Sequence, residues 1–132
     1  MALGGAAACG GGPTSPSSSS TPLASVAGLV SGRTISVSVA SGALAAVGGL
    51  AITQTSLGTF LLSRTGDTTV TALTAICTHE GCTVSNFSGS QFVCPCHGST
   101  FNASGSVANG PANRALQQFA TQVANGVVTF TV

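Results

Sequence analysis

The sequence predicts an all-β domain, and three observations lead to that prediction. Valine and threonine, which suit pleated strands, are abundant, and 18 glycines can supply the turns between strands. Ile35, Val37 and Val39 alternate with polar residues, which is the period of a half-buried strand. No segment has the apolar spacing of an amphipathic helix of convincing length. An apolar fraction of 43% favours a packed core over global disorder.

The length and the charge of the chain exclude several classes of protein. A chain of 132 residues is enough for one domain and not for two. It contains no lysine, and its net charge of +1 comes from Arg33, Arg64, Arg114, Asp67 and Glu80. Three arginines are too few to neutralise a row of phosphates. We therefore expect no nucleic-acid partner. Electrostatic steering of a protein partner should also be weak.

Residues 1–22 differ in composition from the rest of the chain. A segment so rich in glycine, serine and proline buries too little apolar surface to offset its ordering entropy, so we expect a flexible tether. Its residues Ala6, Ala7, Ala8 and Cys9 resemble the end of a bacterial lipoprotein signal peptide, which makes Cys9 a candidate for lipidation. Ala6 stands where leucine or valine is typical, and a free cysteine in the tether is the alternative. The longest apolar run, residues 42–52, has eleven residues against about 20 for a membrane-spanning helix.

The region 23–132 is expected to form the β domain. Its last two strand-like runs are separated by Asn125-Gly126, the strongest short signal for a hairpin. Other runs are rich in β-branched or aromatic residues and are bounded by turn formers. Following the chain, the expected strands cover residues 35–39, 50–54, 59–63, 68–76, 83–87, 91–93, 119–124 and 127–132.

Four of the five cysteines and both histidines gather in two short segments. The first segment reads C-T-H-E-G-C over residues 77–82, and the second reads C-P-C-H-G-S over residues 94–99. Each offers a cysteine and a histidine close together, between predicted strands rather than on a helix. Loops between short strands allow such side chains to converge on one point. A structural zinc site fits this spacing as well, and a plain disulfide scaffold would leave both histidines without a role.

The two segments resemble the cluster-binding loops of Rieske iron–sulfur proteins, and the resemblance spans residues 68–132. It implies a Rieske fold, with an antiparallel, sandwich-like base and a small cluster-binding subdomain of two loops at about residues 75–112. It also implies one 2Fe–2S cluster, and a disulfide that joins the two loops as in Rieske proteins of the cytochrome bc type. By the family pattern, Cys77 and Cys94 would bind one iron, His79 and His97 the other, and Cys82 would pair with Cys96.

Four further residues match positions that tune or cover the cluster in this family. Ser99 matches a serine whose hydroxyl hydrogen-bonds a bridging sulfide, although serine is also a common turn former. Phe101 stands where high-potential members have a tyrosine, so the top of the Rieske potential range is not expected. Gly110-Pro111 resembles the start of a third, proline-containing loop that covers the cluster, and its alternative is an ordinary turn.

The resemblance implies one-electron transfer outside the cytoplasm, in the periplasm or a similar compartment. The expected partners are a cytochrome-like acceptor and quinol or a redox enzyme as donor, with membrane contact only through a lipid on Cys9. The alternative is a subunit of a larger oxidoreductase, of the arsenite-oxidase or cytochrome bc type. A zinc-binding structural module remains as a third hypothesis. An oxygenase needs a second iron held by two more histidines, which this chain lacks, so it cannot by itself be one.

Overall fold

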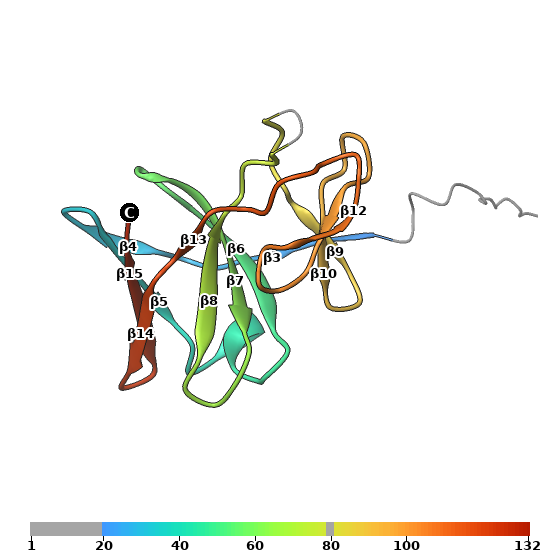
Figure 1. The fold of residues 1–132 in the computed structure, drawn as a ribbon. Helices are drawn as coiled ribbons and strands as arrows, with labels where there is room; N and C mark the ends of the chain where they lie inside the picture. The colour runs from blue at the N-terminus through green and yellow to red at the C-terminus, as the bar shows by residue number, and fades with distance from the viewer. Residues whose placement is uncertain (1–19, 79–80) are drawn as a thin grey trace, which may run out of the picture.

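The computed structural model describes residues 20–78 and 81–132. Within them the chain forms three β-sheets, one of which lies between the other two (Figure 1). We call them the base sheet, the central sheet and the loop sheet. The base sheet has the strand order β14-β15-β5-β4, the central sheet β13-β8-β7-β6-β3, and the loop sheet β12-β11-β10-β9-β2. The all-β fold expected from the sequence is therefore confirmed.

The base sheet consists of β4 (Leu29–Ser31), β5 (Thr34–Ser38), β14 (Thr121–Ala124) and β15 (Val127–Thr131). β5 and β15 follow the sequence prediction closely, whereas β4 was not predicted and β14 begins two residues later than the predicted strand 119–124. In β5 the residues are alternately half-buried and buried, as the apolar–polar alternation requires. The predicted hairpin joins β14 to β15, and Asn125 and Gly126 have φ values of 53° and 74°. Two consecutive positive φ values are the conformation that Asn-Gly favours in a two-residue turn.

The central sheet is buried on both faces. It contains β3 (Ala24–Ser25), β6 (Leu50–Thr55), β7 (Gly58–Arg64), β8 (Val70–Thr74) and β13 (Gln118–Phe119). Four consecutive residues of β7 are buried, because successive side chains point to opposite faces and both faces are covered. Leu61 packs toward the loop sheet, whereas Phe60 and Leu62 pack toward the base sheet.

The loop sheet is built from strands of two or three residues. They are β2 (Thr21–Pro22), β9 (Asn86–Ser88), β10 (Gln91–Val93), β11 (Thr100–Phe101) and β12 (Val107–Asn109). Of these, β10 has the predicted bounds, whereas β9 begins three residues later than predicted, and Thr83 forms only an isolated bridge with Ile76. Thr21 and Pro22, at the end of the predicted tether, pair with β9. Residues 1–19 of the tether, including Cys9, lie outside the described residues.

Two hydrophobic cores fill the spaces between the three sheets. The core between the base and central sheets contains Ile35, Val37, Val39, Leu44, Ala51, Phe60, Leu62, Val70, Ala72, Val128 and Phe130. Leu44 reaches it from a short 3₁₀ turn, η2 (Gly42–Leu44). The core between the central and loop sheets contains Leu23, Ile52, Leu61, Leu73, Ala75, Cys77, Val84, Phe92, Cys94, Phe101, Ala112 and Leu116. The two cysteines proposed as iron ligands thus belong to the second core.

Arg64 anchors the loops at the end of the central sheet. Its guanidinium donates hydrogen bonds to the carbonyl oxygens of Val39, Leu44 and Asp67 at 2.7–2.9 Å. These bonds satisfy carbonyl groups that no strand pairs, so this arginine has a structural role. Separately, no helix among residues 20–78 and 81–132 is long and apolar enough to cross a membrane.

Candidate metal centre

The first Cys/His loop, residues 77–82, is closed by hydrogen bonds between its own ends. It follows β8 and projects from one end of the molecule (Figure 1). The Cys77 amide donates to the Cys82 carbonyl at 2.7 Å, and the Gly81 amide donates to the Cys77 carbonyl at 2.9 Å. Gly81 has φ of 74°, a left-handed conformation that glycine adopts at little cost. The loop therefore turns back on itself and leaves Cys77 on the core side.

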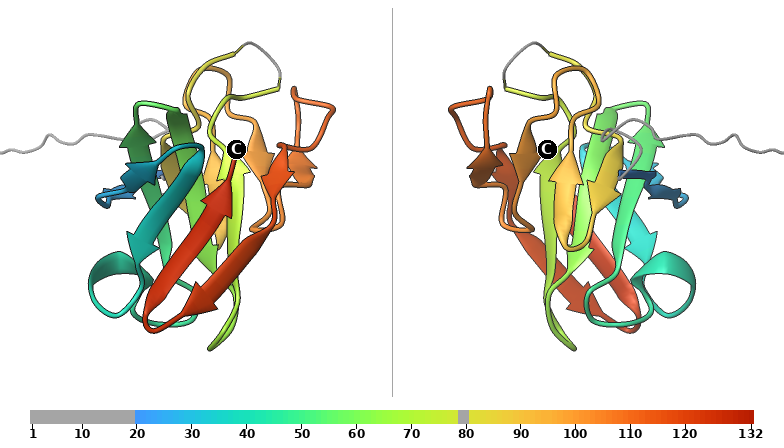
Figure 2. Two further views of the ribbon diagram at one scale, coloured as in Figure 1. Left: turned by 90° about the vertical axis from the view of Figure 1, so that its left-hand side faces the viewer. Right: turned by 90° about the vertical axis from the view of Figure 1, so that its right-hand side faces the viewer.

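The second loop, residues 94–99, repeats this construction. The Cys94 amide donates to the Ser99 carbonyl at 2.8 Å, and the Gly98 amide donates to the Cys94 carbonyl at 3.0 Å. Gly98 has φ of 80°, like the glycine at the same place in the first loop. Both loops thus share the spacing Cys-x-x-x-Gly, in which the glycine amide bonds back to the cysteine carbonyl. The two loops lie at the same end of the molecule (Figure 2).

The thiols of Cys77 and Cys94 are buried next to each other. Cys77 is 3% exposed and Cys94 is 2% exposed, and their side chains are within hydrogen-bonding reach. Burial raises the pKa of the Cys94 thiol above its ordinary value, the Cys96 backbone amide lowers it, and the Cys77 thiol raises it again. Backbone amides of Cys96 and His97 point toward the Cys94 sulfur, where they would stabilise a metal-bound thiolate.

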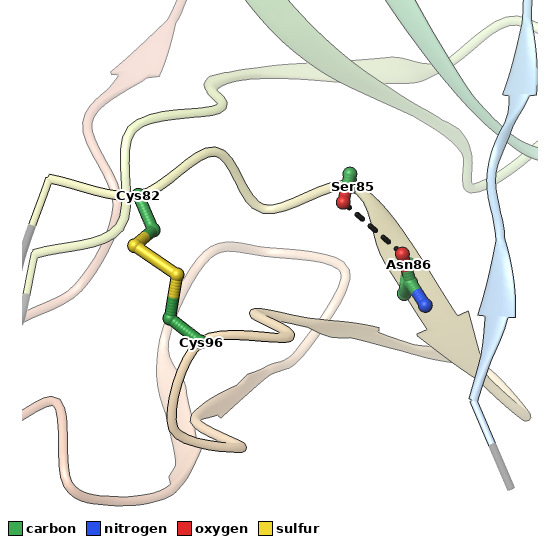
Figure 3. Close-up of a disulfide and its surroundings, with 4 residues drawn as sticks. All are labelled: Cys82, Ser85, Asn86 and Cys96. Carbon is green, nitrogen blue, oxygen red and sulfur yellow. Dashed lines mark hydrogen bonds between the residues drawn. A yellow bond between two sulfur atoms is a disulfide. The ribbon is translucent and has the colours of Figure 1, made fainter. Parts of the chain in front are cut away.

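The predicted bridge between the two loops is present. Cys82 and Cys96 form a disulfide, and its sulfur atoms join the first loop to the second (Figure 3). The S–S distance is 2.06 Å and the Cα–Cα distance is 6.5 Å. Cys77 and Cys94 are the two free cysteines among the described residues. The disulfide therefore removes two of the four loop cysteines from any ligand set and leaves the buried pair for a metal.

Only one of the two histidines lies among the described residues. His97, in the second loop, is exposed, and it lines a cavity of about 830 Å³ together with Cys94. His79 lies outside the described residues. The described His, Cys, Asp and Glu side chains contain no group of three that is already arranged to hold a metal. Of the four predicted ligands, the structure thus describes Cys77, Cys94 and His97.

The third loop, residues 109–112, is held by a side chain from the second loop. Ser99 is 1% exposed, and its hydroxyl oxygen accepts a hydrogen bond from the Ala112 amide at 2.9 Å. Because the oxygen accepts this bond, its proton remains available to donate to a cluster atom. Gly110-Pro111 is a cis peptide bond. The structure therefore adds a partner for Ser99 that the sequence could not reveal, because the two residues are 13 positions apart.

The segment after the third loop is held by the first loop. The Thr78 hydroxyl donates to the Arg114 carbonyl at 2.7 Å. Thr78 was not singled out in the sequence, because nothing local to it indicates a partner 36 residues away. Phe101, by contrast, was singled out, and it is fully buried in the core that contains both free cysteines. A hydroxyl added to its ring would therefore be placed in a dry environment.

Two buried, adjacent thiols, a nearby histidine and backbone amides aimed at sulfur are the chemistry that an iron–sulfur cluster needs. A β domain that presents such a site on two disulfide-linked loops belongs to the class of small iron–sulfur proteins. Within that class, the family described as Rieske [2Fe-2S] domain matches residues 32–120, and the chain belongs to this family. It therefore carries a 2Fe–2S cluster, which replaces the zinc hypothesis.

Curated relatives of this chain include proteins named as iron-sulfur subunits of the cytochrome b6-f complex. The chain is 45% identical over 60 residues to the cytochrome b6-f complex iron-sulfur subunit of Cyanothece sp., covering 45% of this chain and 34% of that protein. It is 50% identical over 54 residues to cytochrome b6-f complex iron-sulfur subunit 2 of Synechocystis sp., covering 39% and 30%. The chain thus spans about a third of the length of these relatives.

A solved structure supports the same family. The cyanobacterial plasma membrane Rieske protein from Synechocystis is 36% identical, with a TM-score of 0.56. The match covers 63% of this chain and 86% of that chain. The likeness therefore extends over most of that protein chain.

Proposed function

We propose that this protein carries single electrons on a 2Fe–2S cluster bound at the tips of its two Cys/His loops. The observation that carries the proposal is the buried pair of free thiols, held together by the disulfide in a chain of the Rieske family. Cys77 and Cys94 would bind one iron as thiolates, and His79 and His97 would bind the other. We also propose that residues 23–132, together with β2, which pairs with β9, form the cluster-carrying domain, and that the residues before β2 serve as its tether.

The surrounding residues would set the properties of the bound cluster. When bound, a 2Fe–2S cluster accepts and releases one electron at a time. Two ferric ions, two sulfides and two thiolates sum to zero charge with neutral histidines, whereas four thiolates give a charge of −2. Adding an electron to a neutral centre is easier, so the mixed ligand set raises the reduction potential. Ser99 would donate its free proton to sulfur, and Phe101 would exclude water without donating.

A spectro-electrochemical titration of the purified holoprotein tests this function. The expected result is one electron per chain, with two iron and two acid-labile sulfide per chain. A chain that binds stoichiometric metal without accepting an electron would contradict the electron-transfer role. The test needs no knowledge of the natural donor or acceptor.

The names of the relatives favour a second form of the same function, in which the domain is a subunit of a larger oxidoreductase. The two curated relatives are named as subunits of the cytochrome b6-f complex. By analogy, quinol would be the electron donor and a cytochrome the acceptor. Purification from the native membrane under mild detergent tests this form, because a subunit should co-purify with haem-containing partners and a free carrier should not.

We further propose that the domain works outside the cytoplasm, in the periplasm or an equivalent compartment. The Cys82–Cys96 disulfide supports this, since disulfides persist mainly in oxidising compartments. A lipid on Cys9 would hold the tether to the membrane, and stable anchoring needs more than one acyl chain. Fractionation of cells that express the natural precursor tests the anchor: Cys9→Ser should release the protein, and an unchanged location in both forms would contradict it.

A further inference from the structure

The segment of residues 20–25 runs from one sheet to another, and we call it the N-terminal strap (Figure 1). Its first strand, β2, pairs antiparallel with β9 of the loop sheet, and its second strand, β3, pairs parallel with β6 of the central sheet. Both strands stand at the edge of their sheets. The strap therefore bridges the two sheets on one side of the core that contains both free cysteines.

Leu23, between β2 and β3, belongs to that core. It is 7% exposed, whereas the two residues of β2 and the two residues of β3 are all exposed. Full burial of a leucine side chain contributes about 1.5–3 kcal/mol relative to leaving it in water. The apolar attachment of the strap to the rest of the molecule therefore depends mainly on this one residue.

Hydrogen bonds attach the strap to the segment that leads from the disulfide into β9. The Leu23 amide donates to the Ser85 carbonyl at 2.9 Å, and the Asn86 side-chain amide donates to the Ser20 hydroxyl oxygen at 3.2 Å. The Ser85 hydroxyl donates to the side-chain carbonyl of Asn86 at 3.1 Å and so orients that amide (Figure 3). Because Cys82 closely precedes Ser85, the strap holds the end of the first loop in place.

The strap can open more easily than the rest of the sheets. It consists of two strands of two residues each, whereas β6 and β7 have six and seven residues and lie inside the central sheet or pair along most of their length. Segments with few buried contacts open at a lower free energy than the whole domain unfolds. The strap also precedes residues 32–120, so the match to the Rieske family assigns no role to it.

We propose that the N-terminal strap is a latch on the cluster core and that Leu23 is the positioning residue that keeps it closed. In the closed state, the strap shields the proposed ligands Cys77 and Cys94 from water. In the open state, water and small chelators reach the bound cluster while the longer strands stay paired. The proposal rests on the proposed function, and it adds a control on cluster retention that lies outside the two Cys/His loops.

Shortening the Leu23 side chain tests the latch. In the Leu23→Ala holoprotein, the chelator EDTA should remove the visible absorption of the cluster about tenfold faster than in the parent. Leu44→Ala is the matched control, because it removes the same side chain from the other core, where Leu44 is fully buried. This control should lower the free energy of unfolding but change the rate of cluster loss by less than about twofold, since the two cores are separate.

Two further measurements distinguish a latch from a general loss of stability. Water near the cluster stabilises the added negative charge of the reduced state, so Leu23→Ala should raise the reduction potential and Leu44→Ala should not. Hydrogen exchange followed by mass spectrometry should be faster at residues 82–88 in Leu23→Ala and unchanged in the hairpin of β14 and β15. Leu23→Met conserves the side-chain volume and should restore the values of the parent. Leu23→Val takes the place of the alanine variant if that variant assembles no cluster.

Any one of four results would overturn the proposal. They are cluster loss in Leu23→Ala at the rate of the parent, equally fast loss in Leu44→Ala, an unchanged reduction potential in Leu23→Ala, or unchanged exchange at residues 82–88. Each of them leaves the one-electron titration of the parent unaffected. A parent that accepts no electron would instead contradict the proposed function itself, so the two failures can be told apart.

Discussion

The base of the molecule and its cluster end are stabilised in different ways. By the base we mean the base sheet, the central sheet and the core between them. There, strands of four to seven residues enclose a continuous apolar core; they are β5, β6, β7, β8, β14 and β15. At the cluster end, strands of two or three residues carry long loops, and the links between them are a disulfide and single side-chain hydrogen bonds. The base depends on many weak contacts, whereas the cluster end depends on a few specific ones.

This contrast predicts that one ligand change abolishes the cluster and leaves the base folded. Cys94→Ala would remove a proposed iron bond that no neighbouring group can replace, so iron and sulfide should fall from two each per chain to none. The far-ultraviolet circular dichroism of the strands should remain. Cys82→Ala is the matched control, because it removes a loop cysteine that is already in the disulfide, and it should still assemble the cluster. An intact cluster in Cys94→Ala would contradict the assignment.

In the base, the largest expected loss comes from removing one aromatic ring. Phe60 packs edge-on against Phe119 and Phe130, with ring centroids 5.6 and 5.4 Å apart. Phe60→Ala should lower the free energy of unfolding by about 3–5 kcal/mol, measured by urea titration of the holoprotein. Phe87→Ala, at a partly buried ring of the loop sheet, is the control and should cost less. A Phe60 variant as stable as the parent would mean that the base does not rely on this core.

The disulfide should matter for cluster retention more than for folding of the base. It closes a loop with a sequence separation of 14, for which chain entropy gives a stabilisation of about 3 kcal/mol. The double variant Cys82→Ala/Cys96→Ala should therefore lose its visible absorption on warming earlier than the parent does. In the untreated parent, neither Cys82 nor Cys96 should react with an alkylating reagent, as mass spectrometry can show. Alkylation of both thiols there would refute the disulfide.

Tuning by Ser99 is a smaller effect and leaves the cluster in place. A hydroxyl donor interacts more strongly with the more negative sulfur of the reduced state, so Ser99→Ala should lower the reduction potential. If the difference between the oxidation states is about 1.4 kcal/mol, the shift is about 59 mV for one electron. Phe101→Tyr should shift the potential in the opposite direction if the new hydroxyl reaches a ligand sulfur. An unchanged potential in Ser99→Ala would mean that its role is limited to the bond with Ala112.

The smallest expected change is a gain of stability in the base. The Thr53 hydroxyl is fully buried and has no hydrogen-bond partner among the described residues. Thr53→Val keeps the shape and removes the unsatisfied group, so it should raise the free energy of unfolding by about 1 kcal/mol. Thr55→Val, where the hydroxyl bonds the Gly58 carbonyl, is the control and should not stabilise. A loss of stability in Thr53→Val would indicate a hydrogen bond that the structure does not show.

The sequence predicted the base more completely than the cluster end, because the base is coded by local patterns. Alternation gave β5, a β-branched run gave β6, and Asn125-Gly126 gave the terminal hairpin. Five short strands were missed, since two or three residues are too few to show a period. They are β2, β3, β4, β11 and β12. The bounds of β9 were also misplaced, because its partners β2 and β10 decide which residues pair.

At the cluster end, the sequence by itself determined the chemistry. The types and spacing of the cysteines and histidines in residues 77–82 and 94–99 indicated the family and its cofactor, because this pair of motifs is highly specific. Only the tertiary structure decided which groups support that site. The bonds from Ala112 to Ser99 and from Thr78 to Arg114 join residues 13 and 36 positions apart. Such contacts leave no local pattern, since they arise only when three sheets have packed and brought distant loops to one end of the molecule.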